Sequence, residues 1–337
     1  MHNPEVILTK NRVSAIVLLG ACFVLVTGCQ NQWQNLGGGT VSRESLRQQA
    51  IETVKTGLSG PGSIDQIYAA EIVAETQLRN FTPELRSMLR SDMVPVRFAA
   101  AVALGDLKYL PARRAIEEAL RDPDHNVRIA AAYALTRFLP DKTHVRLIYE
   151  GLSSNDQTVR ANAALLLGKL RDPSALTALR WAMSDRGSVQ DTRTQAAHSI
   201  ALIGDETIYP TIWTLLISSF ANYRILGVEA MGALGDARAR NAVHTMLQDG
   251  VLDVQLAAAE HLGALGDPSG ERVVLEYLRN PGTAGDALEQ ERQRVRAARA
   301  IGSIGTAALA EFLPQLMQDR SAIVRLAAAR SAIQLTK

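Results

Sequence analysis

The chain has 337 residues, of which 47% are hydrophobic, 21% charged and only 5% aromatic. This hydrophobic share is ample for a folded core and excludes an intrinsically disordered chain. With 36 basic and 34 acidic side chains, the net charge of +2 excludes a nucleic-acid binder that depends on overall charge. Much apolar sequence with few rings predicts a core of Ala, Leu, Ile and Val, which suits closely packed helices.

Residues 1–28 have the pattern of a signal peptide. Two basic residues precede an apolar run over 13–26, which is too short for a bilayer span of about 20 residues. The run ends in Leu-Val-Thr-Gly-Cys, which resembles the lipobox of bacterial lipoproteins. The resemblance implies that Cys29 is lipidated and becomes the first residue of the mature chain. A plain secretory signal or an uncleaved anchor is the alternative.

The cysteine content favours the lipoprotein reading. Only Cys22 and Cys29 occur, and Cys22 lies in the segment to be removed, so no internal disulfide is expected. Residues 29–40 are polar and rich in glycine, which predicts a flexible tether. Gln30 stands where lipoproteins kept in the inner membrane usually carry Asp. By resemblance, the expected location is the cell envelope, in the outer membrane if the cell has two.

Residues 41–62 predict an amphipathic helix over 41–58, followed by a loop. Leu46, Ile51 and Val54 share its apolar face. We expect this helix to cap the first end of the repeats that follow.

A pattern of about 31 residues recurs over residues 63–337. In its clearest copy, Asp172 and Pro173 start one short helix, the pair Ala163-Ala164 marks the contact face of the other, and Gly168 is expected to end it. A ninth, degenerate copy fits around Gln66. The basic position recurs every 31 to 39 residues, at Arg97, Arg128, Arg160, Arg193, Arg224, Gln255, Arg294 and Arg325.

These units resemble HEAT repeats, specifically the short bacterial kind named after phycobilisome lyases. The resemblance implies an all-α fold: a right-handed α-solenoid of about eight HEAT-like helix pairs. Stacked repeats would give an open body about 80 Å long. The 39-residue spacing places an insertion at 280–289, between the two helices of one repeat, and we leave open whether it is a working loop or a tolerated insertion.

The resemblance also implies a structural role for the repeat arginines. In HEAT proteins this side chain pairs with an aspartate a few residues earlier and bridges adjacent repeats. Here Asp122 precedes Arg128 and Asp156 precedes Arg160. We favour this inter-repeat ladder over a row of anion-binding arginines. Its members are Arg97, Arg128, Arg160, Arg193, Arg224, Arg294 and Arg325.

Motifs that carry catalysis are missing from the sequence. The His-Glu dipeptides that bind iron in the HEAT-like deoxyhypusine hydroxylases do not occur, and the chain has no phosphate-binding loop or nucleophile motif. We therefore expect no catalysis, no cofactor and no metal. The alternative is an envelope enzyme or cofactor-handling protein with a site assembled across repeats.

A partner-binding surface is predicted from the second helix of each repeat. The positions two, five and nine after the repeat arginine share one face, which in HEAT solenoids lines the concave side. We expect this inner stripe to bind one or more envelope proteins and no nucleic acid, with a merely solvated face as the alternative. Its predicted contact residues are Tyr133, Leu165, His198, Glu229, Glu260, Arg296 and Arg299.

Overall fold

A computed structural model describes residues 42–139, 143–282 and 285–337. The predicted signal peptide and tether lie outside these ranges. All regular elements of the described residues are helices, with no strand among them, so the fold is all-α as predicted. None of the described helices is long and apolar enough to cross a bilayer.

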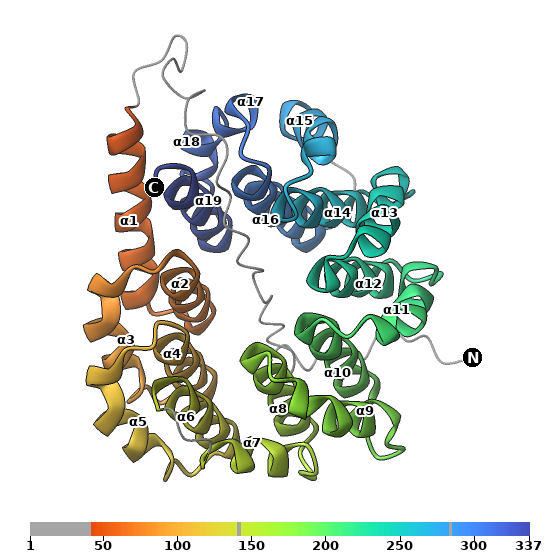
Figure 1. Cartoon of the computed structure of the whole chain (residues 1–337). Helices are drawn as coiled ribbons and strands as arrows, with labels where there is room; N and C mark the ends of the chain where they lie inside the picture. Colours follow the sequence, from red (N-terminus) through yellow and green to blue (C-terminus); the bar gives the residue numbers. More distant parts are fainter. Residues whose placement is uncertain (1–41, 140–142, 283–284) are drawn as a thin grey trace.

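The longer helices form the inner layer of a ring (Figure 1). They are the second helices of the repeats, and each carries the small residues that were expected at the contact face. In the described chain these inner helices are α2 (Ser63–Thr76), α4 (Val94–Asp106), α6 (His125–Phe138), α8 (Gln157–Leu170), α10 (Gln190–Ile203), α12 (Ala221–Leu234), α14 (Leu252–Ala264), α16 (Ala287–Ile304) and α19 (Ala322–Leu335).

The outer layer consists of the 17-residue α1 and of helices shorter than the inner ones. They are α1 (Arg43–Ser59), α3 (Thr82–Met88), α5 (Arg113–Ala119), α7 (Val145–Gly151), α9 (Leu176–Ser184), α11 (Tyr209–Leu216), α13 (Ala237–Thr245), α15 (Glu271–Arg279), α17 (Ala307–Ala310) and α18 (Leu313–Leu316). Several follow a 3₁₀ turn whose start is capped by aspartate: Asp172, Asp205 and Asp267 each accept the amide two residues on.

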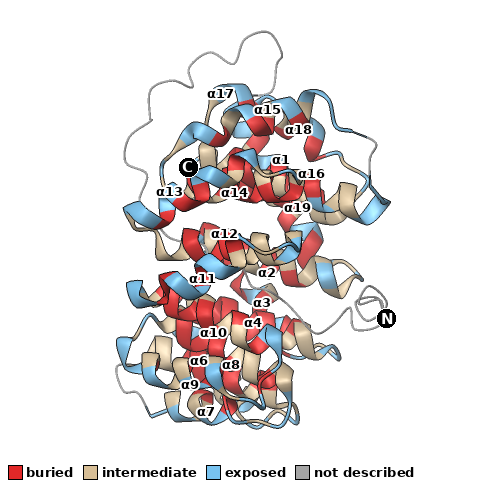
Figure 2. Cartoon of the chain, turned by 90° about the vertical axis from the view of Figure 1, so that its right-hand side faces the viewer, coloured by how far each residue is buried: buried red, intermediate tan, exposed pale blue. Residues whose placement is uncertain are grey.

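Alanine makes the contact between layers and between neighbouring inner helices. Ala163 and Ala164 are completely buried, and the equivalent alanines of the other repeats are at most 2% exposed. Figure 2 shows buried residues concentrated on the inner helices. Side chains this small let helix axes approach closely, which leaves little space for rings. The low aromatic content is therefore a consequence of the repeat.

The glycine inside the inner helix and the left-handed residue just after that helix have different roles in the repeat. Gly168 was expected to end its helix, but α8 continues to Leu170, and Arg171 adopts the left-handed cap with φ of 52°. Gly168 instead lies against α10, where an added Cβ would stand 2.9 Å from the Cα of Ser199. Gly105, Gly232, Gly263 and Gly302 meet the next inner helix in the same way. Because these contacts join the C-terminal parts of neighbouring helices, the inner helices run parallel.

The ring therefore has two distinct edges. We call the edge where the inner helices begin the N-terminal edge, and the edge where they end the C-terminal edge. The outer helices after α1 run back from the C-terminal edge to the N-terminal edge, since they join the end of one inner helix to the start of the next.

Helix α1 closes the ring instead of covering one open end. It lies against both α2 and α19, antiparallel to the latter. Arg43 Nη2 donates to the carbonyl oxygens of Leu335 at 3.1 Å and Lys337 at 3.0 Å. At its other end, Gly57 leaves so little space that an added Cβ would lie 2.9 Å from Leu326 Cδ2. The open body of about 80 Å expected from stacking is thus wrong, because the turn at each joint accumulates until the ends meet.

The insertion lies where the spacing placed it, between α15 and α16. Asp286 caps α16 by accepting the amide of Glu289, and α16 has 18 residues, against 13 or 14 in the other inner helices. Beyond this extra turn, Arg292 places its Nε 3.6 Å from Asp253 of α14.

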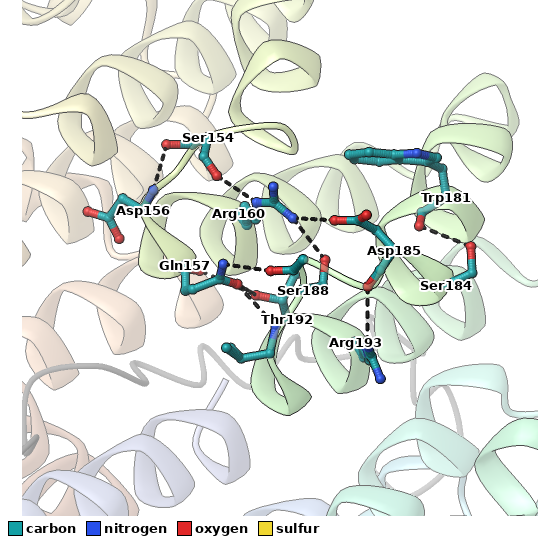
Figure 3. Close-up of polar contacts among 12 residues, drawn as sticks. Ser154, Asp156, Gln157, Arg160, Trp181, Ser184, Asp185, Ser188, Thr192 and Arg193 are labelled. Carbon is teal, nitrogen blue, oxygen red and sulfur yellow. Dashed lines mark hydrogen bonds and ion pairs between the residues drawn. The ribbon is translucent and has the colours of Figure 1, made fainter.

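Four of the seven ladder arginines bridge repeats through ion pairs, with partners that differ from those expected. Figure 3 shows Arg160 between the Ser154 carbonyl of its own repeat and the carboxylate of Asp185, which lies 25 residues later at 2.6 Å. Asp156, the expected partner, instead caps α8 through the amide of Thr158. Likewise, Arg128 donates to the backbone oxygens of Asp122 and Pro123 in its own repeat, and not to the Asp122 carboxylate.

An aspartate that forms an ion pair with a ladder arginine occurs in every second repeat. Ion pairs join Arg97 to Asp122, Arg160 to Asp185, Arg224 to Asp249 and Arg294 to Asp319, at 2.6 to 2.9 Å. At the intervening turns Ser91, Ser154 and Ser218 occupy the equivalent position and accept the same local amide bond. The ring is therefore built from pairs of repeats, each pair joined by one bridge.

Removing Arg224 is expected to cost more stability than removing Arg128. Both arginines donate to backbone oxygens at the start of their own helix, but only Arg224 also makes two bonds to a carboxylate, at 2.7 and 2.8 Å. Arg224→Ala should lower the free energy of unfolding by about 1 kcal/mol more than Arg128→Ala. Urea unfolding of both variants checks this, and equal losses would show that the bridge contributes nothing.

Installing the missing carboxylate should stabilise the chain. The Nε of Arg193 is buried without a hydrogen-bond partner, and Ser218 holds the turn position at which an aspartate would meet it. Ser218→Asp is therefore expected to raise the free energy of unfolding by about 0.5–1 kcal/mol. The same change combined with Arg193→Ala should give no gain; a gain there would mean that the aspartate acts only as a local cap.

Candidate functional site

The predicted inner stripe lies inside the ring, where its charged side chains pair with one another across the inner helices. Arg299 of α16 donates to Glu260 of α14 at 2.7 Å, and Arg296 reaches past α14 to Glu229 of α12 at 3.5 Å. Arg330 of α19 pairs with Glu75 of α2 across the closing joint. These contacts hold together helices that are distant in sequence.

The carboxylate of Asp106 on α4 is the centre of a second group of polar contacts between inner helices. Its carboxylate lies 2.9 Å from the ammonium of Lys169 on α8, so this pair spans α6. Tyr133 of α6 donates its hydroxyl to the same carboxylate. Burial and the neighbouring Asp106 raise the pKa of Tyr133 well above its usual value, so the phenol stays protonated.

The structure does not present the predicted contact residues as a free surface. Tyr133 and Leu165 are each 1% exposed and belong to the core, so neither is an accessible apolar anchor. Glu229, Glu260 and Arg299 are also buried. The physical reason is the curvature: once the ring closes, charges on a concave face are near enough to neutralise each other. Partner binding through this stripe remains a prediction.

The pairing sets the protonation of the buried carboxyl groups. Burial alone would raise the pKa of Glu260, but the Arg299 guanidinium outweighs it and lowers this pKa to about 2. Burial also acts to raise the pKa of Glu75, and Arg330 and Arg299 lower it below the ordinary value. Both groups are therefore carboxylates at neutral pH.

Glu71 behaves differently. It lies one helical turn before Glu75 on α2, and burial followed by repulsion from Glu75 raises its pKa to about 8. Arg299 and Lys169 act in the opposite direction without cancelling these effects. Glu71 is thus a largely protonated carboxylic acid at neutral pH.

Two histidines complete the inner surface. Burial lowers the pKa of both His198 on α10 and His261 on α14 to about 4; His261 further lowers that of His198, and Glu260 only partly opposes the shift of His261. Both rings are neutral at pH 7. His261 packs against α12, where an added Cβ on Gly232 would lie 2.5 Å from its Nδ1. Groups of three or more side chains suited to hold a metal ion do not occur in the part of the chain described.

Glu71 and Glu75 were absent from the predicted stripe, although a signal for them exists. Gln66 occupies the repeat-arginine position of the first repeat and donates to the Gly60 carbonyl six residues earlier, as the arginines do. Glu71 and Glu75 follow Gln66 by five and nine residues, which are the offsets of the stripe. Starting the register at Arg97 left them out.

Comparison with known families now places the chain. A family model for HEAT repeats matches residues 51–136, 112–201 and 145–219, which together cover half of the chain. The chain belongs to the HEAT-repeat family. No curated protein matches its sequence. In this HEAT protein the regular pairs extend beyond the matched residues, through α19.

Solved structures of three other proteins have a similar helical architecture. Human deoxyhypusine hydroxylase in complex with glycerol is 17% identical, covers 78% of this chain and 98% of its own, and has a TM-score of 0.39. The CpcE–CpcF complex of phycocyanin lyase from Nostoc sp. PCC7120 is 18% identical, with coverages of 82% and 98% and a TM-score of 0.43. Kap121p bound to Pho4p is 14% identical, with coverages of 86% and 41% and a TM-score of 0.34. Likenesses this low carry no argument about what this HEAT protein does.

Glu71 gives the HEAT ring a specific pH dependence. Its pKa is about 8 when folded, against an ordinary value of 4.5, so its contribution to stability is complete below about pH 4.5 and is lost as the pH rises through 8. Glu71→Gln removes this loss, so its advantage over the wild type should grow to about 1–3 kcal/mol between about pH 5 and 9. Urea unfolding across this range measures it. Glu52→Gln, at an exposed position on α1, is the control, and parallel curves for Glu71→Gln and the wild type would contradict the assignment.

Proposed function

We propose that this chain is a lipid-anchored scaffold of a bacterial cell envelope that binds one or more other envelope proteins and performs no chemistry itself. The observation that carries the proposal is the pairing of Glu229, Glu260, Arg296 and Arg299 inside the ring. The charged side chains that would have to bind a substrate are already paired with one another, and these pairs hold the inner helices together. What remains available is a large, rigid outer surface, which suits binding to proteins.

The anchor is proposed from the sequence motif at residues 25–29. Lipid on Cys29 would hold the ring at a membrane, and Gln30 favours the outer membrane of a cell with two. Labelling with a fatty-acid analogue tests this: wild type and Cys22→Ala should both be labelled, whereas Cys29→Ala should not. Label retained by Cys29→Ala would refute the anchor.

Partner binding is proposed for the outward-facing helices, because the inner stripe is occupied by its own ion pairs. A photo-crosslinking amino acid at Arg114 of α5, whose side chain is 92% exposed, reports on this surface in living cells. Discrete crosslinked products, identified by mass spectrometry and lost in competition with the unmodified protein, would support a scaffold. The absence of such products from this and other outer helices would leave only a passive spacer.

A second candidate is an envelope enzyme, and Glu71 is the observation in its favour. A carboxyl group whose pKa is near 8 has the protonation behaviour of a general acid, and such shifts are frequent at active sites. Buried ion-pair networks perturb pKa values in the same way, so we rank this candidate second. Metal analysis of the purified protein separates the two, since a stoichiometric metal would favour an enzyme.

A further inference from the structure

Exposed apolar side chains are distributed unevenly over the ring. Of the nine large ones in the described chain, only Leu110 lies at the C-terminal edge, in the turn after α4. The others lie on the N-terminal edge or within one helical turn of it, at the starts of inner helices or the ends of outer ones. They are Ile64, Met93, Trp181, Val189, Trp213, Ile217, Phe220 and Leu288.

Five of these side chains belong to consecutive helices, α9 to α12, and we call them the edge patch: Trp181, Val189, Trp213, Ile217 and Phe220. Trp213 and Ile217 are one turn apart at the end of α11, and Phe220 begins α12 with its ring edge-on to Tyr223. Ile217 is 64% and Phe220 57% exposed. Single exposed apolar residues are ordinary, but such a group on neighbouring elements marks an interaction surface.

Part of the patch lies on a stretch of chain without charge, whereas exposed Arg186 and Asp191 flank Val189. No Asp, Glu, Lys or Arg occurs over residues 207–223, which comprise the end of the 3₁₀ turn Glu206–Ile208, all of α11 and the first turn of α12. Other outer helices present charges to solvent, as α5 does with Arg113, Arg114 and Glu117. Arg160 lies over the ring of Trp181, but its charge is neutralised by Asp185.

We propose that the edge patch docks on the surface of a phospholipid bilayer, with the ring lying on its N-terminal edge. The proposal rests on the lipid anchor proposed at Cys29. Tryptophan is enriched at the interface of a bilayer, where its ring lies among headgroups and its apolar body reaches the acyl chains. A charge in that layer is costly, so an exposed strip without charges suits lipid better than a hydrated partner surface.

The length of the chain before α1 permits this orientation. Helix α1 starts at the C-terminal edge, where Arg43 bonds to the end of α19, and its 17 residues span about 25 Å. Residues 29–42, fully extended, span about 45 Å. An acyl chain on Cys29 can therefore enter the bilayer on which the opposite edge of the ring rests. If the ring instead stood upright on α11, α1 would lie on the far side of the ring from the bilayer (Figure 1).

The contact is confined to one arc of the edge. Helices α6 and α8 begin with the capping carboxylates of Asp124 and Asp156, which keep that part of the edge polar. Docking through the uncharged stretch of α11 and the start of α12 is therefore apolar, and it should occur on zwitterionic lipid and be insensitive to salt.

Fluorescence of single tryptophans tests the docking on the mature protein purified from membranes. The protein is reconstituted into phosphatidylcholine vesicles with or without bromine on the acyl chains, since bromine quenches nearby indole rings. One reporter keeps Trp213 and replaces Trp33 and Trp181 by phenylalanine. The matched control also carries Trp213→Phe, together with Leu110→Trp at the opposite edge.

The Trp213 reporter should lose fluorescence in brominated vesicles at low and at high salt, and the Leu110→Trp control should not. Adding Ile217→Asp to the reporter should abolish the loss. No quenching at Trp213, equal quenching of both reporters, or quenching that survives Ile217→Asp would each overturn the proposal, and a patch covered by a second copy or another protein would give the first of these results. The mass of the same sample shows whether Cys29 is acylated, so failure of the anchor is distinguishable from failure of docking.

Discussion

Glu75→Ala is expected to destabilise the folded chain by about 3 kcal/mol, one of the largest effects of any single substitution we predict. Glu75 of α2 neutralises Arg330 of α19, which is only 5% exposed. Removing the carboxylate leaves a guanidinium buried without its partner at the joint that closes the ring. Urea unfolding measures the loss, and hydrogen exchange should locate increased opening in α1, α2 and α19.

Two controls test whether the loss of stability comes from leaving a buried charge unpaired and not simply from removing an ion pair. Glu52→Ala removes an exposed pair with Lys55 on α1 and should change stability by less than about 0.5 kcal/mol. Replacing both partners, as Glu75→Leu with Arg330→Met, leaves no unpaired charge and should recover most of the loss. A double variant as unstable as Glu75→Ala would mean that the packing of the joint matters and the charge does not.

Gly263→Val should have an effect of similar size, about 3 kcal/mol, for a steric reason. Gly263 lies in α14 where that helix touches α16, and an added Cβ would stand 2.7 Å from the backbone nitrogen of Ile304. Backbone cannot move aside as a side chain can, so the two inner helices must separate. The thermal or urea unfolding transition measures the loss.

Gly266, three residues later, is the matched control. It ends the helix with φ of +79° and has no atom within 4 Å of an added Cβ, so Gly266→Ala should cost only about 1 kcal/mol, from backbone strain. Equal losses for Gly263→Val and Gly266→Ala would show that close helix contact is not what Gly263 provides.

The local structure of this chain can be predicted from its sequence because each signal acts within a few residues. The fixed alanine pair, the Asp-Pro start at Asp172 and the 39-residue spacing located the helix pairs and the insertion. The glycine signal was misassigned because two glycine positions lie three residues apart. Gly168 contacts the neighbouring inner helix, and Arg171 forms the helix end instead.

Ring closure could not be predicted, because it is the sum of small rotations at every joint and no single residue determines them. Once closed, the ring brings Arg330 beside Glu75, which lie 255 residues apart in the sequence. The same closure buries the predicted contact residues Glu229, Glu260 and Arg299 and pairs their charges.

Some features were present in the sequence and overlooked. The alternation of serine and aspartate, at Ser91, Asp122, Ser154, Asp185 and onward, gives the two-repeat period of the ladder. The uncharged stretch 207–223 is equally visible without coordinates. In both cases the signal is a residue type that is missing: the aspartate at every second turn, and any charged residue over 207–223. Residues that recur in every repeat do not reveal such a signal.

The closed ring itself is tested most directly by a distance between spin labels on the two sides of the closing joint. Lys55 of α1 and Arg320, just before α19, are both exposed, and no cysteine follows Cys29, so cysteines placed there are labelled specifically. A ring closed by α1 predicts one short, narrow distance between these labels. An open stack of repeats predicts a distance on the order of 80 Å, or a broad distribution, and either result would contradict the closed ring.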